Sequence, residues 1–368
     1  MTEYSAVERA HMARALALAE RGLFTATPNP RVGCVIVNGG EVIGEGFHER
    51  AGEPHAEANA LEDARRRGRD PRGSTLFVTL EPCNHHGRTP PCVDAILAAG
   101  ITRVVAAMRD PNPAAARGGE RLRATGVRVD FGLMEAEARE LNVGYIARMA
   151  RGTPWVRLKV AASIDGRTAL ANGSSQWITG EEARADGHAW RARACAVLTG
   201  VGTILQDDPQ LTVRAVATTR QPLRVVIDRH ADTPVDARVL SGDGAVLLVT
   251  GGPRNPAWPP DIEMLALPDP GGRVDLPGLM GILGRRGVNE LHVEAGARLN
   301  GALLKAGLVD ELLMYIAPSV LGDPARGIFE LPAPLTSLSE RAPLAWHAVD
   351  RIGPDLRLIA RIVRILDR

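Results

Sequence analysis

The sequence has few cysteines, few aromatic residues and almost no net charge. Four cysteines in 368 residues are too scattered for a disulfide framework, which favours a reducing compartment. With 4% aromatic residues and a formal net charge of +1, it lacks the stacking platforms and basic surface of a nucleic-acid-binding protein. No run approaches the roughly 20 apolar residues of a membrane-spanning helix, and residues 1–21 lack a signal-peptide core. We therefore expect a cytoplasmic protein that acts on a small molecule, without nucleic-acid or membrane partners.

The length and composition indicate a globular protein with more than one domain. Of the 368 residues, 45% are apolar and 24% are charged, which is the profile of folded soluble proteins. This length exceeds that of one ordinary domain. Glycine and proline interrupt the helical pattern at residues 151–154. We therefore predict two domains of the α/β class, residues 1–150 and residues 151–368.

Hydrophobic periodicity in the first half predicts an alternation of helices and strands. Asn38-Gly39-Gly40 has the composition of a hairpin turn between the first two strands. Pro54 and Pro91 each open a helix, because the first helical position needs no backbone N–H. The pattern brings the starts of these two helices to the end of one strand. We expect helices at 5–21, from 54, at 91–100, 120–124 and 135–151, and strands at 31–37, 41–47, 74–80, 101–108 and 127–131.

Three side chains that can bind zinc lie where these elements meet. His55 and Cys92 occupy the first turns of the two helices, and Cys83 follows the strand. Three protein ligands leave one coordination position for water, as in catalytic zinc sites, and zinc lowers the pKa of that water to about 7. Glu57 is a nearby carboxylate that can move the proton. The order His-x-Glu, then Pro-Cys, then a second Cys is typical of zinc deaminases of nucleobases.

Simpler interpretations remain open for these residues. An isolated histidine or cysteine is usually a packed or surface residue, and Cys34 and Cys195 lie in apolar runs that suit small buried side chains. A structural zinc site would need a fourth protein ligand, which His85 or His86 could supply. A nucleic-acid deaminase would need basic and aromatic residues near the zinc, for which the composition gives little support.

The two cysteines are nine residues apart rather than the usual three, and a known family shares this spacing. The first half resembles the deaminase half of the bifunctional riboflavin-biosynthesis deaminase/reductase. Residues 106–113 continue the family pattern, with Arg117-Gly118-Gly119 in place of its Gly-x-Gly. The matching segments are Thr27-Pro-Asn-Pro-Arg-Val-Gly-Cys-Val-Ile-Val37, Pro54-His-Ala-Glu57 and Glu81-Pro-Cys-Asn-His-His-Gly-Arg-Thr-Pro-Pro-Cys92.

This resemblance implies a cytidine-deaminase-like three-layer domain with one Zn²⁺ on His55, Cys83 and Cys92, and with Glu57 as the catalytic residue. The implied reaction is the hydrolytic loss of ammonia from C2 of 2,5-diamino-6-(5-phosphoribosylamino)pyrimidin-4-one. The implied partner is therefore a phosphorylated pyrimidine. The family likeness also suggests substrate contacts, although each of these residues equally fits a turn or a strand end; they are Asn29, His48, and His85 or His86.

The second half alternates short apolar strands with helices, which predicts an α/β sheet covered by helices. No Gly-x-Gly-x-x-Gly follows a first strand, so the common dinucleotide-binding fold has no support. Residues 293–301 instead run from a strand through Gly296 into a helix, whose first N–H groups can hold a phosphate. We expect strands at 156–162, 195–199, 223–227, 245–250 and 290–293, helices at 181–194, 276–286 and 297–306, and late strands at 312–317 and 355–364.

The second half resembles the reductase domain of the same family. The likeness implies a dihydrofolate-reductase-like fold, NADPH as cofactor, and reduction of the ribosyl side chain to give 5-amino-6-(5-phosphoribitylamino)uracil. Ala295 replaces a family glycine, which requires that its φ be negative. The matching segments are Lys159-Val-Ala-Ala-Ser-Ile-Asp-Gly-Arg167, Gly173-Ser-Ser-Gln-Trp-Ile-Thr179, residues 200–214 and Gln221-Pro-Leu-Arg-Val-Val226.

The same resemblance assigns residues to the reductase site. It also suggests a homo-oligomer, a dimer or larger, and leaves open the hydride stereochemistry and the role of the last forty residues. The implied substrate contacts are Ser175, Arg191, Leu211, Arg214 and Glu294. The implied cofactor contacts are Ala161, Trp177, Thr203, Asp207, Gly296, Ala297, Arg298, Leu299, Asn300, Gly301 and Ala302.

Overall fold

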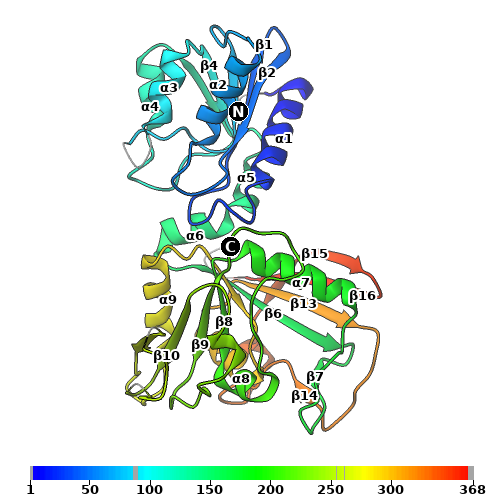
Figure 1. Cartoon of the computed structure of the whole chain (residues 1–368). Helices are drawn as coiled ribbons and strands as arrows, with labels where there is room; N and C mark the ends of the chain where they lie inside the picture. The colour runs from blue at the N-terminus through cyan, green and yellow to red at the C-terminus, as the bar shows by residue number, and fades with distance from the viewer. Residues whose placement is uncertain (1–2, 86–89, 254, 261, 364–368) are drawn as a thin grey trace. The chain divides into compact units, whose positions relative to one another are not determined.

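The structure is a computed structural model that describes residues 3–85, 90–253, 255–260 and 262–363. It divides into two units, Met1–Gly152 and Thr153–Arg368, each with its own sheet and core (Figure 1). No helix in the described ranges combines the length and the apolar character needed to cross a bilayer. The two units are described separately below.

The first unit is built on a mixed sheet with the strand order β2-β1-β3-β4-β5. β1 pairs antiparallel with β2 and β3, whereas β3, β4 and β5 run parallel. The carboxyl ends of β3 and β4 therefore lie at the same edge of the sheet. The elements are α1 (Ala6–Glu20), β1 (Gly33–Asn38), β2 (Glu41–Phe47), α2 (Ala56–Arg66), β3 (Thr75–Val78), α3 (Cys92–Ala98), β4 (Arg103–Ala106), α4 (Gly118–Ala124), β5 (Arg128–Phe131), α5 (Glu135–Leu141) and α6 (Val143–Arg151).

Glycines let α1 and α2 approach opposite faces of this sheet. A Cβ atom on Gly33 would lie 1.9 Å from the carbonyl oxygen of Ala15 in α1. A Cβ atom on Gly46, which pairs with Cys34, would lie 2.4 Å from the backbone nitrogen of Ala60 in α2. Because neighbouring residues of a strand point to opposite faces, Gly33 and Cys34 face different helices. The result is the predicted three-layer arrangement, helix on sheet on helix (Figure 1).

The single helix predicted over 135–151 is wrong, because Asn142 divides it into α5 and α6. The Asn142 backbone leaves the helical region at φ −118°. Its side chain instead binds the backbone of Arg31, where Oδ1 accepts from N–H at 2.8 Å and Nδ2 donates to the carbonyl at 2.9 Å. An asparagine amide can replace a neighbouring strand in this way, and the exchange ties the segment before β1 to the α5–α6 corner.

The second unit contains a larger sheet with the order β11-β10-β9-β8-β12-β6-β13-β16-β15. The pairs from β11 to β13 are parallel, and β16, predicted as a late strand over 355–364, pairs antiparallel with β13. The antiparallel edge strand β15 was not predicted. The elements are β6 (Trp155–Ser163), β7 (Arg167–Ala169), α7 (Glu181–Arg193), β8 (Ala196–Gly200), α8 (Val201–Asp207), β9 (Leu223–Ile227), η1 (Arg238–Leu240), β10 (Val246–Thr250), β11 (Glu263–Ala266), α9 (Leu276–Arg285), β12 (Glu290–Val293), α10 (Ala297–Lys305), β13 (Glu311–Ala317), β14 (Arg326–Gly327), η2 (Leu338–Glu340), β15 (Leu344–Ile352) and β16 (Asp355–Ile362).

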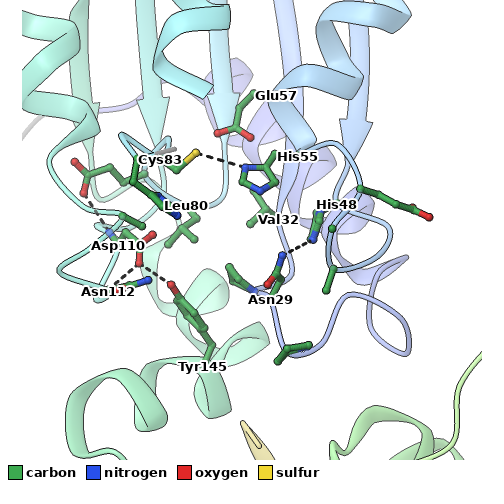
Figure 2. A pocket seen from close by; sticks show the side chains of 18 of the residues that line it. Asn29, Val32, His48, His55, Glu57, Leu80, Cys83, Asp110, Asn112 and Tyr145 are labelled. Carbon is green, nitrogen blue, oxygen red and sulfur yellow. Dashed lines mark hydrogen bonds between the residues drawn. The ribbon is translucent and has the colours of Figure 1, made fainter. Parts of the chain in front are cut away.

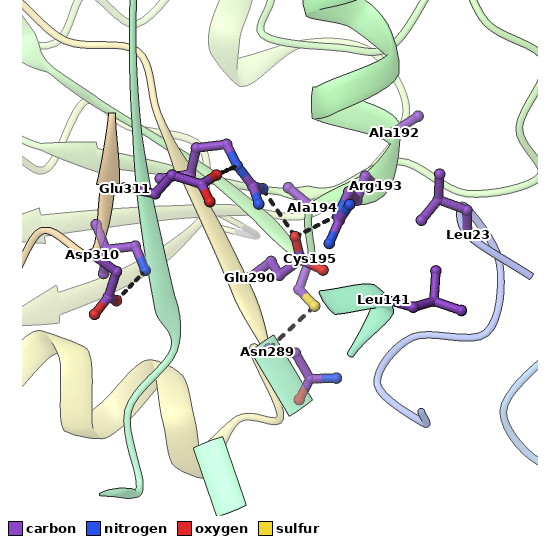
Figure 3. Close-up of polar contacts among 12 residues, drawn as sticks. Leu23, Leu141, Ala192, Arg193, Ala194, Cys195, Asn289, Glu290, Asp310 and Glu311 are labelled. Carbon is purple, nitrogen blue, oxygen red and sulfur yellow. Dashed lines mark hydrogen bonds and ion pairs between the residues drawn. The ribbon is translucent and has the colours of Figure 1, made fainter. Parts of the chain in front are cut away.

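Charged side chains are buried inside the second sheet, and they compensate one another. Arg157 on β6 is 1% exposed and lies 2.9 Å from the Glu290 carboxylate on β12. It also pairs with Glu311 on β13, its partner in the strand register. Arg193 and Arg361 contact the two carboxylates at 2.7 and 3.1 Å, as Figure 3 shows for Arg193 and Glu290. Buried charges persist when they are paired in this way, so the network stabilises one strand register at the centre of the sheet.

The Gly33 contact yields a stability prediction. Gly33→Ala should destabilise the first unit by about 2 kcal/mol, because the added methyl group would push α1 away from β1. Hydrogen exchange of the α1 and β1 amides measures the effect. The control is Gly187→Ala, in which the new Cβ atom on α7 meets nothing within 4 Å. Because alanine has a higher helix propensity than glycine, this change should slightly stabilise the second unit. Equal exchange rates in Gly33→Ala and the wild type would contradict the packing argument.

Candidate functional site

The metal-ligating atoms of His55, Cys83 and Cys92 lie together in the first unit. All three ligand atoms are within 4.8 Å of one another. His55 Nδ1 is 3.2 Å from Cys92 Sγ and 3.5 Å from Cys83 Sγ. His55 is the N-cap of α2, Cys92 is the first residue of α3, and Cys83 lies beyond β3. The helices thus begin at Ala56 and Cys92, after the prolines that were predicted to open them.

This donor set fits zinc. One imidazole and two thiolates are ligands that Zn²⁺ prefers, and a three-ligand site leaves a position for water or substrate. Hydrogen bonding from the Cys92 thiol and from His55 lowers the pKa of Cys83 to about 4. Because Cys92 shares its proton with Cys83 and is buried, its own pKa is raised. One sulfur is therefore ready as a thiolate, and the backbone N–H of Cys92 donates to it at 3.3 Å.

Glu57 lies beside these ligands and differs chemically from an ordinary surface carboxylate. It is 4% exposed, in the first turn of α2. Burial, followed by the negative charge of Cys83, raises the pKa of Glu57 to about 7. Figure 2 shows its carboxylate on the same side of the pocket as Cys83 and His55. A carboxyl group with this pKa can take and return a proton near neutral pH.

Asn29 and His48 form a hydrogen-bonded pair at the edge of the same cavity, which measures about 510 Å³. His48 Nδ1 lies 3.1 Å from the Pro54 carbonyl and Nε2 lies 3.0 Å from Asn29 Nδ2. Burial lowers the pKa of His48. A neutral ring that donates through Nδ1 and accepts from the Asn29 amide satisfies both contacts. This arrangement leaves Asn29 Oδ1 as an acceptor beside His55.

The described residues do not supply a fourth protein ligand. His85 lines the cavity, but it does not belong to the group of ligand atoms that lie within 4.8 Å of one another. His86, the other candidate, lies outside the described residues. Cys34 is fully buried in β1, and Cys195 accepts a backbone N–H from Asn289 at 3.2 Å (Figure 3). Cys34 has the buried role predicted for it, whereas Cys195 is only half-buried.

Glu81 holds the loops around the cavity and was not predicted as a site residue. Its two carboxylate oxygens accept backbone N–H groups from Gly119 at 2.9 Å and Asp110 at 3.1 Å. A Cβ atom on Gly118 would lie 1.8 Å from the carbonyl oxygen of Pro82, so the start of α4 can approach only as glycine. The Arg117-Gly118-Gly119 sequence was therefore the signal for this contact, since close backbone approach is a principal use of glycine.

Asp110, Asn112 and Tyr145 also line the cavity and were missed (Figure 2). Asp110 and Asn112 follow β4, which runs parallel to β3. Parallel strands end at the same edge, so their position after the strand was a usable signal. Tyr145 lies on α6, and its hydroxyl donates to Asp110 at 2.9 Å. Nothing in the sequence around Tyr145 indicates which residues that helix faces.

In the second unit, the predicted substrate contacts Arg191 and Glu294 form a bidentate ion pair. Arg191 Nη2 lies 2.9 Å from Glu294 Oε2, and the second contact joins Nε to Oε1. Lys159 Nζ approaches the same carboxylate at 3.9 Å. Burial raises the pKa of Glu294. The positive charges of Arg191 and Lys159 have the larger combined effect and hold this pKa well below its ordinary value. The carboxylate is therefore ionised beside two cations.

Arg214 joins this cluster through His188. The backbone N–H of Arg214 donates to His188 Nδ1 at 3.3 Å, and its guanidinium contacts Gln210 and Thr212. Burial, and then the charges of Arg191 and Arg214, lower the pKa of His188 to about 4, so its ring is neutral. The buried Leu211 adopts a positive φ of 56° within this loop. This cluster has three cations, Arg191, Arg214 and Lys159, and one carboxylate, that of Glu294. Its excess of positive charge would favour the binding of an anionic group.

A hollow of about 490 Å³, lined by residues 172–176, 206 and 207, contains two more predicted residues. Ser175 Oγ donates to Asp207 Oδ1 at 3.3 Å. Trp177 is 69% exposed, and Arg184 stacks 4.6 Å from its ring. Ala161 lies on β6 and Thr203 on α8, both partly exposed. These positions are consistent with surface-accessible binding residues.

The predicted phosphate turn is divided between exposed and packed residues. Gly296 is the exposed N-cap of α10, where an added Cβ atom would meet nothing within 4 Å, and Ala297 and Arg298 follow it. This helix start fits a phosphate group of a cofactor such as NADPH. The next three residues are packed. Leu299 lies close to Gly200, the Asn300 side chain donates to the Ile328 carbonyl, and Gly301 lies against the backbone of Glu330. Ala302 follows in the same helix. Ala295 is not among the residues with positive φ, so the condition set for it is met.

Comparisons with known proteins agree with this division. Residues 5–108 match the model of the cytidine and deoxycytidylate deaminase zinc-binding region, and residues 154–356 match that of the RibD C-terminal domain. The chain is 49% identical to the riboflavin biosynthesis protein RibD of Escherichia coli, covering 95% of this chain and 97% of that protein. The chain belongs to the RibD family. The RibD of Haemophilus influenzae is 44% identical over 97% of this chain and 98% of that protein.

Solved structures of RibD proteins resemble the whole chain. A structure of Acinetobacter baumannii RibD gives a TM-score of 0.90 at 39% identity, covering 97% of this chain and 99% of the other. The Thermotoga maritima diaminohydroxyphosphoribosylaminopyrimidine deaminase/5-amino-6-(5-phosphoribosylamino)uracil reductase gives 0.89 at 34% identity, with the same coverage. The predicted fold class, a deaminase-like α/β domain followed by a reductase-like one, is confirmed.

The Glu81 contacts predict a link between loop packing and metal binding. Glu81→Ala should cost about 2–5 kcal/mol of stability and weaken zinc binding, because two buried N–H groups lose their acceptor next to Cys83. Glu81→Gln keeps one acceptor oxygen, so its stability and zinc affinity should lie between those of the wild type and Glu81→Ala. Denaturant unfolding and zinc titration measure both effects. The control is Glu120→Ala, which changes an exposed side chain on α4, the helix that Glu81 contacts. If Glu81→Ala bound zinc as tightly as this control, the link would be contradicted.

Proposed function

We propose that the chain is a bifunctional enzyme of riboflavin formation, with a deaminase in residues 1–150 and a reductase in residues 151–368. The first activity converts 2,5-diamino-6-(5-phosphoribosylamino)pyrimidin-4-one by hydrolysis, exchanging the C2 amino group for oxygen and releasing ammonia. The second reduces the ribosyl side chain with NADPH and gives 5-amino-6-(5-phosphoribitylamino)uracil. The observation that carries this proposal is the His55, Cys83 and Cys92 group with Glu57 beside it.

In the deaminase, His55, Cys83 and Cys92 would hold Zn²⁺. When bound, this ion supplies a water with a pKa near 7 at the open position. Glu57 takes a proton from the attacking water and delivers it to the departing amino group, so that ammonia leaves. With a pKa of about 7, Glu57 is suited to both transfers. Its burial keeps bulk water from competing for the proton.

The cavity wall binds and orients the pyrimidine. Asn29 Oδ1 is available as an acceptor because the Asn29 amide group donates to His48. The neutral His48 ring is fixed by the Pro54 carbonyl and lies edge-on to His55, with ring centroids 5.3 Å apart. Amino groups on the substrate ring suit such an acceptor. The same contacts therefore hold both the substrate and a zinc ligand in place.

In the reductase, NADPH supplies the hydride when it is bound. The start of α10 at residues 296–298, together with Ala161, Trp177, Thr203 and Asp207, forms its proposed binding surface. The packed residues of the predicted turn, Leu299, Asn300 and Gly301, hold this helix start in place. Arg191 and Arg214 hold the sugar-phosphate substrate, since a guanidinium can engage two phosphate oxygens. Ser175, Leu211 and Glu294 complete the proposed substrate contacts. The net positive charge of the cluster supports the binding of a phosphorylated substrate.

The proposed surroundings of the enzyme follow from the same features. The four cysteines are free, in agreement with a reducing cytoplasm. The substrates are small phosphorylated pyrimidines rather than nucleic acid, because the chain has a net charge of +1 and 4% aromatic residues.

Glu57→Gln tests the deaminase. Ammonia release from the diaminopyrimidine substrate should fall about 100-fold to 10,000-fold, because an amide cannot transfer the proton. Zinc content should stay near one per chain, since Glu57 is not a proposed ligand. Enzyme-coupled ammonia detection and elemental analysis provide the two measurements. As a matched control, Glu62→Gln changes an exposed carboxylate on the same α2 helix, outside the residues that line the cavity, and should retain most of the activity.

The reductase provides an internal control for the same variant. NADPH consumption with the deaminated product should proceed at the wild-type rate in Glu57→Gln. Wild-type ammonia release in that variant would exclude the proposed proton transfer. Loss of NADPH consumption would instead contradict the independence of the two sites.

We also propose that the chain forms a homo-oligomer through the edge strand β15. This strand exposes Trp346 (66%), Val349 (59%) and Leu344 (44%), an apolar stripe on an edge with unpaired backbone groups. An exposed hydrophobic edge strand is a template for pairing with another chain. A second copy is the proposed occupant, because a two-fold axis can pair the same strand with itself.

The oligomer proposal predicts that Trp346→Glu shifts the chain toward a monomer. A charge placed in the apolar stripe would be buried without a partner on association. Light scattering after size exclusion measures the mass of each species. Val7→Lys alters an equally exposed side chain on α1 and serves as the control. A monomeric wild type, or an unchanged mass in Trp346→Glu, would contradict this interface.

A further inference from the structure

The deaminase cavity contains a buried hydrogen-bonded pair that the proton-transfer scheme does not use. Tyr145 and Asp110 both line the cavity that contains His55, Cys83 and Glu57. They are 6% and 9% exposed, respectively. Figure 2 shows the pair below the metal-ligating group, with the tyrosine hydroxyl directed at the carboxylate. A buried carboxylate in a substrate cavity costs free energy unless it is bound to something, so its contacts identify its role.

The contacts of Asp110 fix one of its oxygens and leave the other available. Oδ1 accepts from the Tyr145 hydroxyl at 2.9 Å and from the backbone N–H of Asn112 at 2.9 Å. The Asp110 backbone N–H is bound to Glu81. Among the residues that the structure describes, Oδ2 has no hydrogen-bond partner. The carboxylate is therefore held by one oxygen while the other is free to accept a bond.

We propose that Tyr145 is a positioning residue for deamination, whose hydroxyl fixes Asp110 so that Oδ2 accepts a hydrogen bond from an amino or hydroxyl group of the substrate. This inference rests on the proposed function and extends its binding site by one residue pair. The substrate has such donors on the pyrimidine ring and on the ribose. Neither residue touches the proton that Glu57 transfers, so the pair acts on binding and orientation.

The tyrosine contributes something that the local Asn112 contact cannot. The Asn112 N–H lies two residues from Asp110 and moves with the same loop, whereas Tyr145 is 35 positions away on α6. The terminal torsion of an aspartate is broad and roughly two-fold, so a second, remote donor is needed to set which oxygen faces the cavity. Burial raises the pKa of Asp110 to about 6, and it therefore remains mostly ionised at neutral pH. An ionised carboxylate can only accept, which matches donors on the ligand.

The test uses the full-length, zinc-loaded chain and steady-state ammonia release from the diaminopyrimidine substrate. Tyr145→Phe removes the hydroxyl alone, and Asp110→Asn alters the carboxylate. Tyr145→Phe should raise KM about 3-fold to 10-fold, the range of one hydrogen bond, and leave kcat within about two-fold. Asp110→Asn should raise KM at least as much. The double variant should resemble Asp110→Asn, because the tyrosine acts through the aspartate.

The choice of KM separates positioning from a structural effect. Partial unfolding lowers the number of active chains and hence kcat, but leaves KM unchanged. Tyr4→Phe is the matched control, because it removes another tyrosine hydroxyl of the first unit, one that donates to the Phe131 carbonyl away from the cavity. That variant should keep the wild-type KM.

Three outcomes would overturn the inference. One is an unchanged KM in Tyr145→Phe, and another is a KM effect that multiplies with that of Asp110→Asn in the double variant. The third is loss of zinc from Tyr145→Phe, which would mean that the residue acts on the metal site. If the wild-type chain itself releases no ammonia, the proposed function fails and this inference fails with it. Wild-type release with an unchanged KM in Tyr145→Phe contradicts the inference alone.

Discussion

The arrangement of the deaminase cavity depends on the Glu81 carboxylate. One of its oxygens binds the first turn of α4 through Gly119, and the other binds the loop after β4 through Asp110. Its own backbone N–H bonds to Met108 in that loop. Two residues later the chain reaches Cys83, so a single side chain fixes the loop that carries a proposed metal ligand against the loop that carries Asp110, the proposed substrate contact. Charge-assisted bonds of this kind are stronger than neutral ones.

The sheet makes this connection possible because β3 and β4 are parallel neighbours. Loops after parallel strands leave the sheet at one edge, and α2 and α3 begin there with His55 and Cys92. A helix start has free N–H groups and a positive partial charge, which favours thiolates and carboxylates. The metal ligands, Glu57 and the Asp110 loop thus converge without any special backbone conformation. The chemistry is placed by strand order and by two helix starts.

The sequence predicted this site well where local rules apply. The grouping of His55, Cys83 and Cys92 follows from ligand chemistry and from proline near the helix starts, and most strands of both sheets follow from apolar runs. The edge strands β11 and β15 were not predicted, because both are largely exposed and have no apolar run. The break at Asn142 did not, because its cause is a pair of hydrogen bonds to Arg31, which is remote in sequence. Tyr145 was missed for the same reason. A residue whose partner comes from another element leaves no periodic signal, whereas Gly118 did leave a signal in its unusual Arg-Gly-Gly sequence.

Two charged clusters of the second unit are arranged in different ways, and the difference matches their proposed roles. In one cluster, Arg191 and Lys159 contact the single carboxylate of Glu294, whereas the Arg214 guanidinium contacts Gln210 and Thr212, so a positive excess remains for the proposed phosphate. Deeper in the same sheet, Arg157, Arg193 and Arg361 share the carboxylates of Glu290 and Glu311, so every cation of that cluster contacts a carboxylate. A compensated network stabilises a strand register, whereas an uncompensated one gains stability only when an anion binds. Whether each cation contacts a carboxylate therefore distinguishes the structural cluster from the proposed binding cluster, which burial alone does not.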